Sequence, residues 1–190
     1  MPDLSPAPPL PRKEEPQPEE LSAMAISMIE PQSRSVNPLD MVEQVVTARA
    51  WPCDRLGDDE LNLVIETSWS DLQLTITWCA DLESLQLACA LEMKVPPTRR
   101  LQVHSLLALI NERLWLGHFD LWSEDQVILY RHGLPLQGGA IANAEQCETI
   151  IQFAIETCER FYPAFQYVLW GGKSPEEAIA ASLLDCAGEA

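Results

Sequence analysis

The sequence predicts an α+β fold, in which an antiparallel β-sheet packs against amphipathic helices, from three observations. Apolar and polar residues alternate through three consecutive segments between Leu61 and Met93, which is the period of strands with one buried face. Apolar residues recur at helical spacing in Val103–Leu114 and in Cys147–Phe161. The segments between the strands are too short for crossover helices, so neighbouring strands should pair antiparallel.

The first 37 residues predict a disordered tail. They hold most of the prolines, interleaved with glutamates, and cannot bury enough apolar surface to offset the entropy of an ordered chain. Within them, the apolar segment Leu21–Ile29 either docks on a partner or on the protein itself, or is an inert part of the tail. The predicted organisation is therefore a Pro/Glu-rich tail at 1–37 and an α+β domain at 38–190.

A helix is predicted to open the domain at Pro38, because Asn37 can cap it and proline suits the first helical position. This helix should end by Trp51, since Pro52 disfavours a helical residue before it. The acidic run Gly57–Glu60 then indicates a solvated turn, because it lacks the alternating ligands of a calcium loop.

Three strands are predicted next, joined as a meander. Their apolar positions are Leu61, Leu63 and Ile65 in the first strand, Leu72, Leu74, Ile76 and Trp78 in the second, and Leu85, Leu87, Cys89, Leu91 and Met93 in the third. The residues between these positions point the other way, so one apolar face should be directed towards a core.

A second helix is predicted after Pro96 and Pro97, with Thr98 as its cap. Its apolar face consists of Val103, Leu106, Leu107, Ile110 and Leu114. Gly117 is predicted to end this helix, and a two-stranded hairpin with a turn near Ser123–Asp125 should follow.

The predicted hairpin carries apolar side chains on both of its faces. Phe119, Leu121, Ile128 and Tyr130 share one face, and Trp122, Val127 and Leu129 share the other. We expect one set to pack on the helices and the other set to pack on a second subunit or on the tail.

Two further helices are predicted to complete the domain. The longer helix is capped near Asn143, and its apolar face consists of Cys147, Ile150, Ile151, Ala154, Ile155, Cys158 and Phe161. Pro163 should bend or break this helix, and Phe165–Trp170 should form a linker. The terminal helix begins at the capping box Ser174–Glu177.

The formal net charge of the chain is −17. This charge repels phosphate backbones and anionic membranes, so neither nucleic acid nor a membrane is an expected partner. It either serves solubility alone or steers the protein onto basic segments of a partner. The six cysteines fall in no CxxC pair, and neither a signal-peptide pattern nor a long apolar run occurs, so we expect a cytoplasmic protein with reduced cysteines.

No motif indicates catalysis, a metal or a cofactor. The segment Gly172–Ser174 resembles the end of a phosphate-binding loop, but the required glycine is replaced by Tyr167. The histidines lack metal-ligand spacing, although the hairpin would bring His118 and His132 near Asp120. Because no serine lies in a GxSxG elbow either, we expect a non-enzyme with no catalytic, cofactor-binding or metal-binding residues.

Six tryptophans are many for a chain of 190 residues. A tryptophan buries a large area while its ring N–H can reach a partner, which suits an interface. The residues predicted to form a protein interface are Trp115, Trp122, Val127, Leu129 and Trp170. The alternative is that all six tryptophans lie in or near the core.

The segment LINERLWLGHFDL at Leu109–Leu121 resembles the YbjN family, whose bacterial members are described as candidate regulators of sensory transduction. The likeness continues through Val127–Arg131, Cys158–Pro163 and Trp170–Lys173, so it covers the chain from about Pro38 onwards. The resemblance implies a fold similar to that of type III secretion chaperones, in the order helix, three strands, helix, two strands and helix. It also implies dimers that hold extended segments of partner proteins.

The resemblance supplies no catalytic residues. The pattern positions with expected structural roles are Asn111, Gly117, Phe119, Tyr130 and Arg131. Asn111 is expected to cap backbone groups near the end of its helix, and Gly117 to supply the left-handed turn into the hairpin.

The leading hypothesis is a chaperone-like or regulatory protein-binding module that forms a homodimer and engages a protein client. One alternative is a small-molecule-binding regulator or an unrecognised enzyme, with a pocket between the sheet and the helices near His118, Asp120 and Arg131. Another alternative is a purely structural partner within a larger assembly.

Overall fold

The computed structural model describes residues 37–187, and the side chains of residues 37–182. All described elements belong to the second of the chain's two units, Ser33–Ala190. The predicted tail, with its apolar segment Leu21–Ile29, lies outside the described residues except for Asn37.

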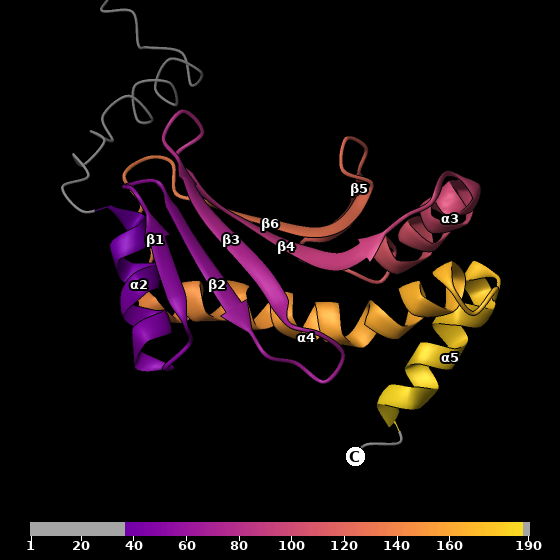
Figure 1. Cartoon of the computed structure of the whole chain (residues 1–190). Helices are drawn as coiled ribbons and strands as arrows, with labels where there is room; N and C mark the ends of the chain where they lie inside the picture. Colours follow the sequence, from indigo (N-terminus) through magenta and orange to yellow (C-terminus); the bar gives the residue numbers. More distant parts are fainter. Residues whose placement is uncertain (1–36, 188–190) are drawn as a thin grey trace, which may run out of the picture. The chain divides into compact units, whose positions relative to one another are not determined.

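Six strands and four helices follow one another along the described residues (Figure 1). The helices are α2 (Pro38–Ala48), α3 (Arg100–Asn111), α4 (Ala144–Leu169) and α5 (Pro175–Ala187), and a short 3₁₀ helix, η1 (Pro97–Arg99), precedes α3. The strands are β1 (Cys53–Leu56), β2 (Glu60–Ile65), β3 (Leu72–Cys79), β4 (Ser84–Lys94), β5 (His118–Trp122) and β6 (Val127–Pro135). The predicted α+β class is confirmed.

All six strands form one antiparallel sheet in the order β1-β2-β3-β4-β6-β5. The first four strands make a meander, and the β5–β6 hairpin joins the meander through the pairing of β6 with β4. The β4–β6 register shifts between Leu91 and Lys94, as happens where a bulge bends a strand. Figure 1 shows β4 and β6 curving along their length.

One face of the sheet is buried and the other face is open. The alternating leucines and isoleucines of β2, β3 and β4 are buried, and Phe119, Leu121, Ile128 and Tyr130 continue the buried face through the hairpin. Helices α2 and α4 pack on this face, and Figure 1 shows α4 running across the sheet. Each fully buried leucine or isoleucine contributes roughly 1.5–3 kcal/mol, which is why the alternation determines the strand register.

Three helices begin where their capping residues predict. The Asn37 side chain accepts a backbone hydrogen bond at the start of α2, and Asn143 forms a reciprocal capping box with Gln146 at the start of α4. Ser174 and Glu177 exchange side-chain and backbone hydrogen bonds at the start of α5. These contacts satisfy N–H groups that a helix start leaves without partners.

The start and end of α3 differ from the prediction. Thr98 lies in η1 and does not cap α3, whose first turn continues from that 3₁₀ helix without a side-chain cap. The helix ends at Asn111 and does not reach Leu114, because the Asn111 side chain bonds the backbone of Phe119 and the chain turns there. Leu114 nevertheless packs against the core from beyond the helix end.

The long helix α4 corrects a second prediction. It continues through Pro163 to Leu169, so the linker predicted at Phe165–Trp170 is wrong. A proline inside a helix costs roughly 3 kcal/mol. Phe165 and Val168 are fully buried beyond it, and the apolar area that they bury offsets this cost.

Candidate functional site

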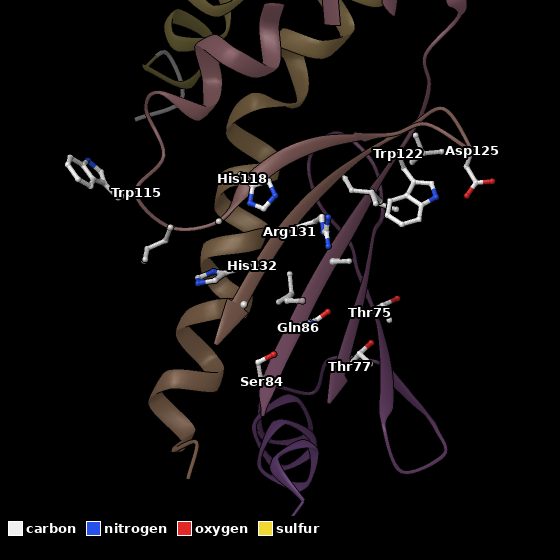
Figure 2. A pocket seen from close by; sticks show the side chains of 18 residues that line it. Thr75, Thr77, Ser84, Gln86, Trp115, His118, Trp122, Asp125, Arg131 and His132 are labelled. Atoms are coloured by element: carbon white, nitrogen blue, oxygen red, sulfur yellow. The ribbon is translucent and has the colours of Figure 1, made fainter. Parts of the chain in front are cut away.

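The open face of the sheet contains a cleft of ≈1030 Å³, shown in Figure 2. Strands β3, β4 and β6 form its floor, and it is bordered by the loop before β5 and by the β5–β6 turn. Its apolar lining consists of Leu87, Ala88, Ala90, Trp115, Leu116, Trp122, Val127 and Leu129. Its lining with polar side chains consists of Thr75, Thr77, Ser84, Gln86, His118, Asp125, Arg131 and His132.

Small residues on the two neighbouring strands β4 and β6 make the cleft deep. Ala88 and Ala90 lie on β4, and Gly133 lies on β6, where the space that a Cβ would occupy is empty. Two tryptophans stand at the borders, Trp115 with 98% of its surface exposed and Trp122 with 42%. In Figure 2 these two side chains lie on opposite sides of the cleft centre.

An ion pair joins Arg131 of the cleft lining to Asp120 on the neighbouring strand β5. Arg131 Nη1 lies 3.6 Å from Asp120 Oδ2, and both side chains are about half exposed. An exposed pair of this kind contributes at most about 1 kcal/mol to stability. The carboxylate nevertheless balances the positive charge of Arg131, and Asp125 is the acidic side chain of the lining.

His132 lies at the end of the cleft near Gly133. Burial lowers the pKa of His132, so its imidazole is neutral at neutral pH. Its Nδ1 atom is buried and has no hydrogen-bond partner in the structure. A buried polar atom without a partner costs about 1–3 kcal/mol, so it lowers the stability of this end of β6.

Hydrogen bonds at both ends hold the loop that carries Trp115. Asn111 Nδ2 donates to Phe119 O at 3.0 Å, and Phe119 N donates to Asn111 Oδ1 at 2.9 Å. The Tyr130 hydroxyl donates to Leu116 O at 3.1 Å. The loop is therefore fastened to α3, β5 and β6 while its tryptophan points outwards.

The hydroxyl of Tyr130 lies under this loop. Burial raises the pKa of Tyr130 to about 12, so the hydroxyl remains a neutral donor over the physiological pH range. The Phe119 ring meets Tyr130, Phe161 and Phe165 edge to face, with ring centres 5.4, 6.2 and 5.3 Å away. These contacts attach the hairpin to α4 and fix the position of the cleft border.

The segment resembling a phosphate-binding loop joins α4 to α5. Lys173 N donates to Tyr167 O, and Lys173 Nζ lies 4.2 Å from the centre of the Tyr167 ring. Within residues 37–182, no group of three or more His, Cys, Asp or Glu side chains is arranged to hold a metal. Among the described helices, none combines the length and apolar character needed to cross a bilayer.

A family model for YbjN, described as "Putative bacterial sensory transduction regulator", matches residues 38–167. The chain belongs to the YbjN family. The resemblance seen in the sequence is thereby confirmed, and the match includes every residue that lines the cleft. No curated protein matches the chain.

The solved structures that are similar to this YbjN-family chain include the following two. The crystal structure of YbjN from E. coli, described as "a putative transcription regulator", is 13% identical, with a TM-score of 0.47 over 63% of this chain and 84% of that one. A structure of the HopA1–SchA chaperone–effector complex is 16% identical, with a TM-score of 0.43 over 62% of this chain and 86% of that one.

Four of the five predicted interface residues of this YbjN-family chain come together. Trp115, Trp122, Val127 and Leu129 line the cleft, whereas Trp170, with 63% of its surface exposed, lies outside it. Four of the pattern positions lie in or under the loop that borders the cleft: Asn111, Gly117, Phe119 and Tyr130. The fifth, Arg131, points into the cleft. Whether these residues bind a partner stays a prediction.

The residues that make the cleft hollow were not predicted from the sequence. Ala88 and Ala90 occupy outward positions of a strand where larger polar residues are usual, and this was the available signal. The two alanines alone do not predict a cleft, because the sequence does not show that β6 lies beside β4.

Proposed function

We propose that this YbjN-family protein is a non-enzymatic binding module with a regulatory or chaperone-like role, and that its cleft holds a segment of another protein. The family's description as a sensory transduction regulator supports a regulatory role. The observation that carries the proposal is the group of exposed apolar side chains, including Trp115 and Trp122, on the open face of the sheet. Exposed apolar surface of this kind typically marks an interaction site, and tryptophan is enriched among the residues that dominate binding energy.

The position of the cleft favours a protein segment over an enclosed small molecule. The cleft opens along the surface of the sheet, whereas small-molecule sites usually enclose most of the ligand. Buried apolar side chains of the core pack between the sheet and the helices, which favours the cleft over the hypothesised interior pocket. A homodimer and a cytoplasmic location remain parts of the proposal.

The proposal is tested by crosslinking followed by affinity measurement. A photo-crosslinking amino acid in place of Gln86, which lines the cleft, should capture a partner in native cells, and mass spectrometry should identify it. Binding of the purified partner is then measured by calorimetry. The Trp122→Ala variant should bind at least about tenfold more weakly, because a tryptophan in an interface commonly contributes 2 kcal/mol or more.

Trp69→Ala is the matched control. Trp69 is exposed to nearly the same extent as Trp122, 43% against 42%, but it does not line the cleft. Its replacement should leave the affinity within about twofold. Equal affinities for Trp122→Ala and the unmodified protein, with both variants folded, would reject the cleft as the binding site.

A further inference from the structure

Strand β6 is longer than the strand that pairs with its outer edge. Strand β5 pairs with β6 only from Val127 to Arg131, whereas β6 continues to Pro135. The chain turns away from the sheet at Gly117, which has a positive φ of 67°. Among the described residues, no strand lies beside the segment His132–Pro135 on this side, and we call the position of the missing neighbour the open lane.

The backbone of this segment presents hydrogen-bonding groups to the open lane. Leu136 N donates to Glu83 O at 2.7 Å, so the backbone groups of Leu136 are directed towards β4. Residues of an antiparallel strand bond alternately to one side and the other, and the register here is unbroken, so Leu134 is also directed towards β4. The N–H and C=O of Gly133 and the C=O of Pro135 therefore point into the open lane.

The open lane is continuous with the cleft. Both His132 and Gly133 line the cleft, as do Trp115 and Leu116 of the neighbouring loop. Leu134 is half-buried at the edge of the core. A strand added here would continue the line of β5, cover Leu134 and place side chains beside Gln86, Trp115 and Leu116 at this end of the cleft.

The formal charges around the open lane favour a basic occupant. Asp120 already balances Arg131 of the cleft lining. At the Pro135 end, the β3–β4 turn contributes Asp81 and Glu83 one strand away, across β6 from the open lane, because Ser84 of β4 pairs with Pro135. The chain as a whole carries a net charge of −17, which attracts basic segments and repels a second copy of the same chain.

We infer that an extended segment of a partner protein, apolar in its centre and basic at its end, adds to the sheet as a strand in the open lane and pairs with Gly133. The inference rests on the proposed function and specifies its mode of binding. In strand addition, main-chain hydrogen bonds supply affinity and the neighbouring side-chain pockets supply specificity. The Gly133 N–H is the donor on which the pairing depends.

Two substitutions of one residue test this donor. Gly133→Pro removes the N–H that points into the open lane and leaves the β4 ladder intact, because proline is tolerated at a strand edge. Gly133→Ala retains the N–H and places its methyl group in empty space. The probe is a labelled synthetic peptide of alternating valine and threonine flanked by lysines, and binding is measured by fluorescence anisotropy. Gly133→Pro should weaken binding about tenfold, the effect of one lost hydrogen bond, whereas Gly133→Ala should not.

Three comparisons make the result decisive. The same peptide with its backbone nitrogens methylated should bind the unmodified protein about tenfold more weakly, which tests the pairing even if Gly133→Pro fails to fold. A peptide flanked by glutamates that binds as well as the lysine peptide would overturn the basic character of the partner. A dimer that Gly133→Pro converts to monomer would show that a second copy occupies the open lane.

The outcome also separates this inference from the proposed function. If Trp122→Ala weakens binding of the peptide while Gly133→Pro and backbone methylation do not, the cleft binds protein segments without strand addition. If none of these changes affects binding, both ideas are wrong.

Discussion

Gly117 combines two constraints that act on a single residue. Its φ of +67° lies in the left-handed region, where a residue with a Cβ is disfavoured by roughly 1–2 kcal/mol. The hydroxyl and ring of Tyr130 also occupy the space that a Cβ would need. Gly57 has a similar φ of +75° but open space around it, so the chain contains its own control for the backbone effect.

Replacement of the two glycines should therefore have different costs. Gly117→Ala should lower the free energy of unfolding by about 2–4 kcal/mol, because backbone strain adds to overpacking against Tyr130. Gly57→Ala should lower it by only about 1 kcal/mol. Urea unfolding of both variants measures the difference. Equal losses would mean that the Tyr130 ring yields without cost and that only the backbone requires glycine here.

At the scale of elements, β1 shows how a strand can form without a visible pattern. Its four residues, Cys53–Leu56, have no alternation of apolar and polar side chains, and three of the four are exposed. Arg55 Nη1 donates to Asp40 Oδ1 at 2.7 Å and to Glu43 Oε2 at 2.6 Å, so the strand is tied to α2. The hydrogen bond to Asp40, followed by that to Glu43, raises the pKa of Arg55.

The attachment of β1 can be tested by removing its guanidinium. Arg55→Ala should speed hydrogen exchange of the β1 and β2 amides and lower the free energy of unfolding by about 1 kcal/mol, because these ion pairs are partly exposed. Exchange in β3 and β4 should not change. Arg113→Ala is the control, since among the described residues the Arg113 side chain bonds the Leu109 carbonyl of the preceding helix and not β1. Unchanged exchange in β1 would show that its ladder with β2 is sufficient.

The elements that could be predicted are those whose burial is periodic. The meander from Leu61 to Met93 and the three capped helices follow directly from alternation and capping chemistry. The end of α3 and the continuity of α4 could not be predicted, because they depend on tertiary contacts of Asn111 and of the residues beyond Pro163. The cleft could not be predicted for the same reason. Its tryptophans were visible in the sequence, but its floor exists only because β6 crosses back beside β4.

At the scale of the whole molecule, net charge governs association. Two copies with a formal charge of −17 each repel one another, and added salt screens that repulsion. The expected homodimer must therefore gain its stability from apolar contacts. Trp170, which is exposed and lies outside the cleft, is the predicted interface residue that remains available for this contact while the cleft is occupied.

The mass in solution tests this expectation. Light scattering at high protein concentration should give about twice the chain mass of 21.3 kDa, with a larger dimer fraction at higher salt because repulsion is screened. Trp170→Ala should shift the equilibrium to monomer, and Trp69→Ala should not. A mass of one chain under all of these conditions would remove dimerisation from the proposed function.

The fastened loop before β5 has a consequence for the thermodynamics of association. A side chain presented on a mobile loop loses conformational entropy when it binds, at roughly 1–2 kcal/mol for each backbone residue that becomes ordered. The bonds from Asn111 and Tyr130 already restrict the loop in the free protein, so Trp115 is preorganised for contact. Most of that entropy has been lost during folding, and more of the contact energy of the indole is therefore retained as affinity.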